Sequence, residues 1–334
     1  MTRSFRLASL CVIALLAVAC AGGTGGATGI PATASASPSG SGSTGACPMT
    51  PAPEGTPEGW DVSTQRPTVF PQIINPSGSV TCGTTRLMFS FLDDQNTPIA
   101  KPDRTVSVKA FDLGADPATP VAEGPATFIW AIEPRVGVYV ADLDLPTAGA
   151  YGVEFTTTPA GGAAEVIRTT MDVQPSTDVI GVGDMAPASK TPTLDQVDGD
   201  IAKISTDSEP VPAFYETSIA EAVAAKEPFV VAFATPKFCT SQQCGPTLDR
   251  LKPIAAKHPD VTVINVEPYL LEEVDGSLQP VLTNGALTPT QAVNEWHLPT
   301  EPWVYVVDRD GVVTASYMLI FSDEELDEAM AAVE

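Results

Sequence analysis

Two cysteines, Cys239 and Cys244, are the residues of this 334-residue chain best suited to redox chemistry. Four residues separate them, and such a loop can bring their Cα atoms to the spacing of about 4.4–6.8 Å that a disulfide needs. The apolar run 229–234 predicts a buried strand, and the apolar periodicity from Cys244 to Ala255 predicts a helix. Free N–H groups at a helix N-terminus stabilise a thiolate, the nucleophile of thiol–disulfide exchange. The pattern therefore predicts a reversible dithiol/disulfide pair.

The order of strand, turn, cysteine pair and helix resembles the active-site unit of the thioredoxin fold. The Phe-Cys step ending at Cys239 and the Cys-Gly-Pro step beginning at Cys244 are similar to the two halves of the thioredoxin motif. Thr247 stands where the second cysteine of that motif would be, so the motif is split. The resemblance predicts an α/β thioredoxin-like domain over residues 211–334 and implies that Cys239 and Cys244 are its catalytic residues. Because Cys244 has the better position at the helix end, it is the expected attacking thiolate.

A proline ahead of the next predicted strand fits the same resemblance. Pro302 and Trp303 open the apolar run 304–308, which is followed by a turn at Gly311. Thioredoxin-like proteins place a cis-proline beside their cysteines at this point, and cis X-Pro bonds are uncommon features. The resemblance implies that Pro302 and Trp303 form a surface on which a partner chain docks. The alternative is that Pro302 only begins a strand, a position that proline tolerates.

Three other roles for the cysteine pair stay open. The Cys239–Cys244 disulfide could be structural, within a non-catalytic tethered binding protein. Together with His297, the pair could form a soft copper site, as in thioredoxin-like copper chaperones, although these use a different cysteine spacing. The Cys239-Thr240 context resembles atypical two-cysteine peroxiredoxins, but Pro236 replaces the hydroxyl that this family keeps three positions before its cysteine. The sequence predicts neither a cofactor nor a bound metal.

The start of the chain predicts export. Arg3 and Arg6 precede a short apolar run, so residues 1–19 are a predicted signal peptide. Cys20 follows Leu-Ala-Val-Ala, which resembles the bacterial lipobox, and is the predicted lipidation site; secretion without a lipid is the alternative. Residues 20–64 are rich in Gly, Ala, Ser, Thr and Pro, which predicts a lipid-anchored disordered stalk. We therefore expect an extracytoplasmic protein, anchored to the cell membrane.

Residues 65–174 have the pattern of a β domain. Several short runs alternate apolar and polar side chains and are separated by Gly/Pro turns, which predicts an all-β sandwich. The sequence Gly-Ala-Tyr151-Gly-Val resembles the tyrosine corner of immunoglobulin-like domains. The predicted organisation is thus a sandwich at 65–174, a polar linker at 175–210 and the cysteine-containing domain at 211–334.

The remaining cysteines predict a second disulfide. Exported proteins meet an oxidising environment, in which cysteines usually pair. Once the signal peptide and the lipidated cysteine are set aside, four of the six cysteines remain, and four allow three connectivities. The most economical connectivity joins Cys47 to Cys82 as a structural disulfide and leaves Cys239 beside Cys244.

The charge of the chain limits its partners. Acidic residues number 41 and basic residues 17, which gives a formal net charge of −24. So negative a protein repels phosphate backbones, which excludes nucleic acid as a partner class. The expected partners are exported proteins that carry thiols or disulfides, together with the membrane that holds the lipid anchor.

Overall fold

The computed structural model describes residues 47–334 of the protein. The predicted signal peptide, the lipidation site Cys20 and residues 20–46 of the predicted stalk lie outside the described residues. Within the described range, no helix combines the length and the apolar character that crossing a membrane requires.

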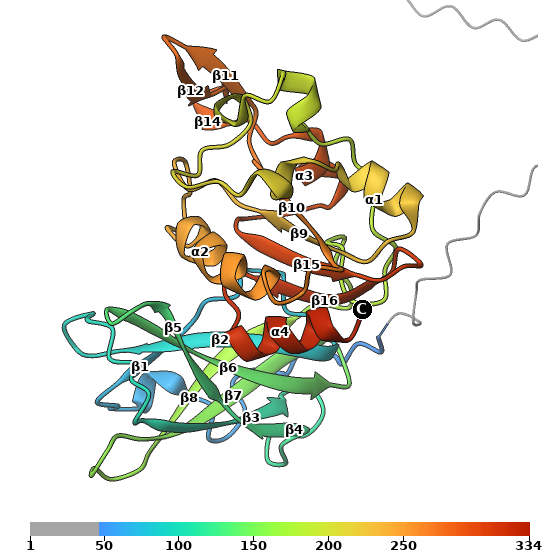
Figure 1. The fold of residues 1–334 in the computed structure, drawn as a ribbon. Coiled ribbons are helices and arrows are strands. Elements are labelled where there is room, and N and C mark those ends of the chain that lie inside the picture. Colours follow the sequence, from blue (N-terminus) through green and yellow to red (C-terminus); the bar gives the residue numbers. More distant parts are fainter. Residues whose placement is uncertain (1–46) are drawn as a thin grey trace, which may run out of the picture. The chain divides into compact units, whose positions relative to one another are not determined.

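Two four-stranded antiparallel sheets form a β sandwich in the first part of the described chain (Figure 1). The first sheet, in the order β1-β2-β6-β5, consists of β1 (Phe70–Ile73), β2 (Gly83–Leu92), β6 (Val136–Leu145) and β5 (Thr127–Ile132). The second, in the order β4-β3-β7-β8, consists of β4 (Ala122–Pro125), β3 (Thr105–Asp112), β7 (Gly149–Thr158) and β8 (Glu165–Val173). A short 3-10 helix, η1 (Val62–Thr64), precedes them. The predicted β sandwich is confirmed, and its architecture is consistent with the immunoglobulin-like resemblance.

The core of the sandwich lies between its two sheets, because alternate side chains of each strand point to the same face. Its largest members are fully buried aromatic residues: Phe89, Phe91, Tyr139, Tyr151 and Phe155. The Tyr151 hydroxyl donates a hydrogen bond to the Thr147 carbonyl oxygen at 3.0 Å. This is the contact back to the upstream backbone that a tyrosine corner makes.

A second core is built on a mixed four-stranded sheet in the order β10-β9-β15-β16. Its strands are β10 (Thr262–Val266), β9 (Phe229–Phe233), β15 (Trp303–Val307) and β16 (Val313–Met318). The β9–β10 pair is parallel, and the other two pairs are antiparallel. Two small hairpins lie between β10 and β15 in the chain: β11 (Leu271–Val274) with β12 (Ser277–Pro280), and β13 (Leu282–Thr283) with β14 (Ala286–Leu287).

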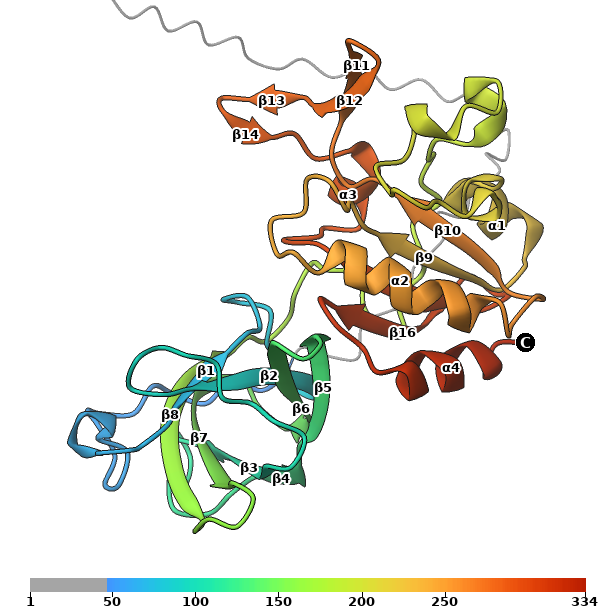
Figure 2. The ribbon, with the colours of Figure 1, turned by 60° about the vertical axis from the view of Figure 1, so that its left-hand side comes forward.

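Short helices cover this mixed sheet. Helices α2 (Cys244–Ala255) and α4 (Asp323–Ala331) lie side by side over one face (Figures 1 and 2). Apolar residues of α1 (Ile219–Ala225) and α3 (Gln291–Glu295) join the core on the other face. Three further 3-10 helices, η2 (Leu194–Val197), η3 (Ile201–Lys203) and η4 (Pro212–Tyr215), precede α1.

The described chain is mainly β, with 16% of its residues in helices. The predicted α/β thioredoxin-like class for residues 211–334 is therefore wrong. The alternation of strand and helix, on which that prediction depended, breaks after β10, where residues 271–287 form four short strands instead. No α/β thioredoxin-like domain is evident in residues 47–334.

The first sheet of the sandwich is buried on both faces. Side chains on its outer face belong to the same apolar cluster as the strands of the mixed sheet: Met88, Ile129, Ala131, Val138 and Val140. Arg86 of β2 also forms a bidentate ion pair with Glu325 of α4, at N–O distances of 3.0–3.1 Å. The sandwich and the C-terminal part of the chain therefore share apolar and ionic contacts.

Candidate functional site

The two predicted redox cysteines are joined as a disulfide at the start of α2. Cys239 lies in the loop that leaves β9, and Cys244 is the first residue of the helix. Their Cα atoms are 6.0 Å apart, within the usual range for a disulfide. The buried strand and the helix that the sequence predicts around the pair are present, so the local order of elements follows the prediction.

The two cysteine residues differ in exposure. Cys244 is completely buried against the apolar side chains beneath α2, whereas Cys239 is half-buried. The backbone N–H of Cys244, at the open end of the helix, donates to the Cys239 sulfur at 3.1 Å. The Ser241 hydroxyl lies 3.4 Å from the same sulfur. The polar groups that would stabilise a thiolate therefore gather on Cys239.

The peptide bond between Glu301 and Pro302 is cis, as the resemblance implies. Pro302 is buried, and the Glu301 carbonyl oxygen accepts a hydrogen bond of 2.8 Å from Ser241 in the cysteine loop. The start of β15 therefore lies against the loop that connects the cysteines.

Trp303 faces away from the cysteine helix. Its side chain is only 7% exposed, stacks on Tyr305 with ring centroids 5.6 Å apart, and belongs to the core on the other face of the sheet from α2. The reason is the alternation of β15, which directs Val304 and Val306 toward α2 and Trp303 away from it. Trp303 therefore has little side-chain surface open to solvent, and its docking role stays a prediction.

Glu301 is a site residue that the sequence analysis did not identify. Although charged, it is 2% exposed, and its carboxylate lies beside the cysteine loop. The backbone N–H and the hydroxyl of Thr240 both donate to Oε1 at 2.7 Å, and the Tyr269 hydroxyl donates to Oε2. Burial and the adjacent Glu301 carboxylate raise the pKa of Tyr269. Nothing in the sequence around Glu301 distinguishes it from the other acidic residues of the chain.

Cys239, Cys244 and Glu301 bring their sulfur and carboxylate atoms within 4.8 Å of one another. Once the disulfide is reduced, two thiols beside one carboxylate can act on thiols or bind a cation. His297, the histidine considered for a copper site, is exposed and is not a member of this group.

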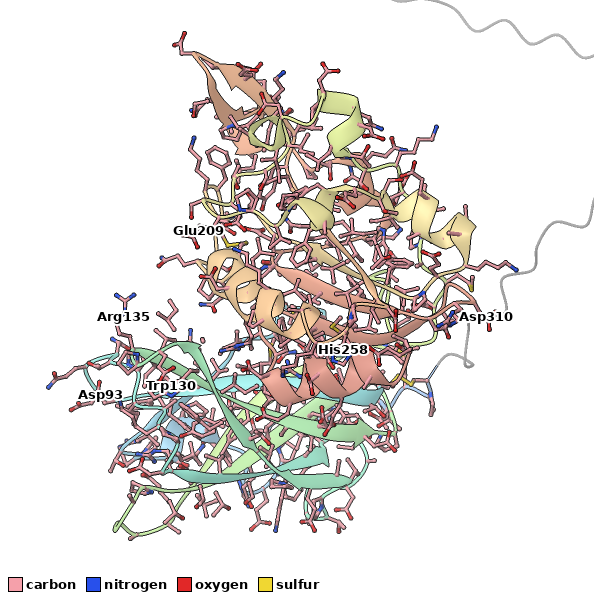
Figure 3. The ribbon with its side chains drawn as sticks, viewed as in Figure 1. Asp93, Trp130, Arg135, Glu209, His258 and Asp310 are labelled. Carbon is pink, nitrogen blue, oxygen red and sulfur yellow. A yellow bond between two sulfur atoms is a disulfide. The ribbon has the colours of Figure 1, made fainter. Side chains whose placement is uncertain are left out.

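His258 lies beside acidic residues of α4 and of the chain end. It is 7% exposed and its ring lies against α4 (Figure 3). Its Nδ1 is 2.8 Å from a Glu334 carboxylate oxygen, and its Nε2 is 3.4 Å from Asp327. It therefore anchors the end of the chain and is not part of the cysteine group.

Lys237, two residues before Cys239, directs its ammonium to the β11–β12 hairpin. Its ammonium donates to the Ser277 hydroxyl and to the Leu278 carbonyl oxygen, each at 2.9 Å. Both acceptors belong to β12, so Lys237 fastens the β11–β12 hairpin to the loop before Cys239.

The other predicted site cysteines lie apart from this group. Cys47 and Cys82 are joined as a disulfide with a Cα separation of 6.4 Å, the pairing that the sequence favours. Their bridge ties the segment before η1 to the start of β2. Cys20, the predicted lipidation site, is outside the described residues.

Comparisons with known proteins give no family for the chain. No protein-family model matches it, and no curated protein matches it. Among solved structures it is similar to the crystal structure of a DUF4426 family protein from Pseudomonas aeruginosa, at 15% identity and a TM-score of 0.24. That similarity covers 34% of this chain and 97% of the other protein. So low a TM-score carries no argument about fold or function.

Proposed function

We propose that Cys239 and Cys244 form a reversible dithiol/disulfide pair that exchanges with thiols and disulfides of other exported proteins. The observation that carries this proposal is the asymmetry of the pair. The sulfur of the half-buried residue Cys239 accepts the hydrogen bond of a helix-end N–H, while Cys244 is fully buried. An exchange reaction needs one reachable, stabilised thiolate and one shielded partner, whereas a structural bridge needs neither.

Burial gives the two sulfur atoms separate roles in this proposal. Cys239 is the attacking thiolate, because a partner disulfide can approach it and the Cys244 N–H stabilises its charge. Cys244 is the resolving cysteine, because no partner sulfur can reach it directly. This order is the reverse of the one predicted from helix position alone.

The exchange has two balanced steps. The Cys239 thiolate attacks one sulfur of a partner disulfide, which forms a mixed disulfide and releases the other partner sulfur as a thiolate that takes a proton. The Cys244 thiolate then attacks the Cys239 sulfur, which closes the intramolecular disulfide and releases the second partner thiolate. The partner gains two electrons and the cysteine pair loses two, so a dithiol reductant has to restore the pair. In the opposite direction, the same steps oxidise a partner dithiol.

The proposal assigns this exchange to the space outside the cytoplasm. Its support is the basic and apolar start of the chain and the lipobox-like sequence before Cys20. A lipid on Cys20 would keep the protein at the membrane. The sandwich, which we propose is immunoglobulin-like because of the corner at Tyr151, would serve as a spacer or a partner-binding arm.

Trapping of mixed disulfides tests the proposal. Cys244→Ala leaves the attacking thiol but removes the resolving one, so it should accumulate mixed disulfides with exported proteins through Cys239. Cys239→Ser should capture far fewer, because the remaining sulfur is buried. The matched control is the chain carrying both substitutions, which should capture none. Partners are counted by non-reducing gels and identified by mass spectrometry.

The reduction potential of the pair distinguishes exchange from a structural role. A catalytic pair should equilibrate with glutathione and show a potential between about −120 and −230 mV, whereas structural disulfides lie below about −300 mV. A potential in the structural range, together with no capture by Cys244→Ala, would leave the non-catalytic binding protein as the function of the chain.

A further inference from the structure

We infer that the reduced form of the cysteine site binds a divalent cation of the zinc type through Cys239, Cys244 and Glu301. The ligand atoms of these three residues already lie within 4.8 Å of one another. This inference goes beyond the proposed exchange reaction and depends on it in one respect, namely that the disulfide can be reduced. Oxidation joins the two sulfur atoms and removes both from coordination, so the site exists only in the reduced protein.

The donor set selects the metal. Thiolates are the preferred ligands of Zn²⁺ and of soft cations, while Ca²⁺ and Mg²⁺ require several oxygen ligands. The single carboxylate favours Zn²⁺ over Cu(I), which prefers sulfur or imidazole donors, and the exposed His297 is not in the group. Three protein ligands of a tetrahedral zinc leave one open position for water or an incoming thiol.

Hydrogen bonds hold the Glu301 carboxylate in a fixed orientation, as is usual for carboxylates that bind metals. Its side chain is 2% exposed, and the N–H and hydroxyl of Thr240 and the hydroxyl of Tyr269 fix its orientation. Carboxylates that bind metals are usually oriented in this way by outer hydrogen bonds. Those three donors leave about one acceptor position on the carboxylate free, since two oxygens offer about four.

Charge and access also favour cation binding. The net charge of −24 attracts cations to the protein, and the half-buried Cys239 leaves a route into the group. On binding, each thiol releases one proton to solvent, so two protons are released for each Zn²⁺ bound. The Cys244 N–H, which donates to the Cys239 sulfur, stabilises the Cys239 thiolate.

The test compares reduced and oxidised protein. The full chain is reduced with a phosphine, its free thiols are counted, and Zn²⁺ binding is measured by competition with a chromophoric chelator. Cd²⁺ serves as a second probe, because its bonds to thiolates give ultraviolet charge-transfer absorption. The reduced protein should bind one ion per chain, and the oxidised protein should bind none at this site.

Variants locate the site. Glu301→Gln preserves an acceptor for Thr240 and should weaken Zn²⁺ binding by about 100-fold, and Tyr269→Phe, which removes an outer hydrogen bond, by about tenfold. The matched control is Glu267→Gln, which alters a buried carboxylate outside the group and should bind Zn²⁺ like the wild type. Circular dichroism establishes that each variant is folded.

The outcomes separate this inference from the proposed function. If the thiols are free and the reduced protein binds no Zn²⁺, or if Glu301→Gln and Glu267→Gln bind equally, the metal site is refuted while disulfide exchange stands. If the phosphine leaves the Cys239–Cys244 bridge oxidised in the folded protein, both ideas fail together. A thiolate–Cd²⁺ absorption that needs both cysteines and Glu301 supports the site.

Discussion

Glu301 and Glu267 are two acidic side chains with different hydrogen bonding. Glu301 has hydrogen-bond donors on both oxygens, whereas the buried Oε2 of Glu267 has no hydrogen-bond partner among residues 47–334. Burial raises the pKa of Glu267 to about 7, although hydrogen bonds from Thr206 act in the lowering direction. Glu267 is therefore a group whose protonation changes near neutral pH while it stays inside the protein.

Glu267 should make the folded state less stable as pH rises. Its folded pKa of about 7 lies above the ordinary value of 4.5, so between these pH values the folded state holds a proton that the unfolded chain has lost. The free energy of unfolding should therefore fall by up to roughly 3 kcal/mol from pH 4.5 to pH 7, and this contribution should stay constant above pH 7. Glu267→Gln, which imitates the protonated acid, should match the wild type near pH 4.5 and exceed its stability above pH 7. Urea unfolding at a series of pH values measures the difference, and parallel curves would contradict the assignment.

The sequence could identify the cysteines but not the acids around them. Cysteines are few, and their position between an apolar run and a helix start is visible in the chain. Glu301 and Glu267 are two of 41 acidic residues, and nothing in their own sequence neighbourhoods separates them from surface acids. Each acid is hydrogen-bonded by a residue distant in sequence, Tyr269 in one case and Thr206 in the other. Only the folded arrangement supplies that information.

At the scale of elements, prediction succeeded where local signals were strong. Helix α2 begins at Cys244, where the sequence predicts a helix. Helix α1 begins with a capping box of Ser218 and Glu221. The hairpins β11–β14 gave no such signal, because their side chains are mostly exposed and lack a clean alternation of apolar and polar residues. These hairpins interrupt the alternation of strand and helix that the sequence analysis expected.

Lys237 should hold the β11–β12 hairpin in place. Its ammonium makes two hydrogen bonds to β12, but the side chain is exposed, so we expect a contribution of only about 1 kcal/mol. Lys237→Met should therefore speed hydrogen exchange of the amides in residues 271–280 by about fivefold. The control is Lys190→Met at another exposed lysine, which should leave these amides unchanged. A loss of Cys239 thiol reactivity in Lys237→Met, without faster exchange in the hairpin, would instead show that the ammonium acts on the sulfur.

At the scale of the whole molecule, one ionic cluster connects the sandwich to the last helix. Arg86 pairs with Glu325 and lies over the Tyr317 ring, with 5.7 Å between its guanidinium carbon and the ring centroid. Burial raises the pKa of the neighbouring Asp142 carboxyl, while the charge of Arg86 acts in the lowering direction. Glu325 also caps α4 through the backbone N–H of Ser322. A single side chain thus stabilises a helix and joins two parts of the protein.

A double-mutant cycle should measure this connection. Glu325→Gln retains an oxygen that can cap α4 but removes the charge, and Arg86→Met removes the guanidinium. The side chains are 17% and 31% exposed, so each change should lower the free energy of unfolding by about 1–2 kcal/mol, with a coupling of about 1 kcal/mol between them. The exposed Lys109–Glu123 pair, with an N–O distance of 3.9 Å, is the control and should show no measurable coupling. Additive effects of Arg86→Met and Glu325→Gln would mean that the ion pair contributes nothing to stability.

The double burial of the first sheet has a consequence for how the protein can be divided. Most sandwiches expose their outer faces to water, so such a domain can be cut free and remain soluble. Here a fragment ending at residue 174 would present the apolar outer-face side chains of β2, β5 and β6 to solvent, including Met88, Ile129 and Val140. Contiguous apolar patches of this kind promote self-association. A fragment beginning at residue 211 would lose the sandwich side chains that pack against its own apolar cluster, so we expect both fragments to self-associate when they are separated.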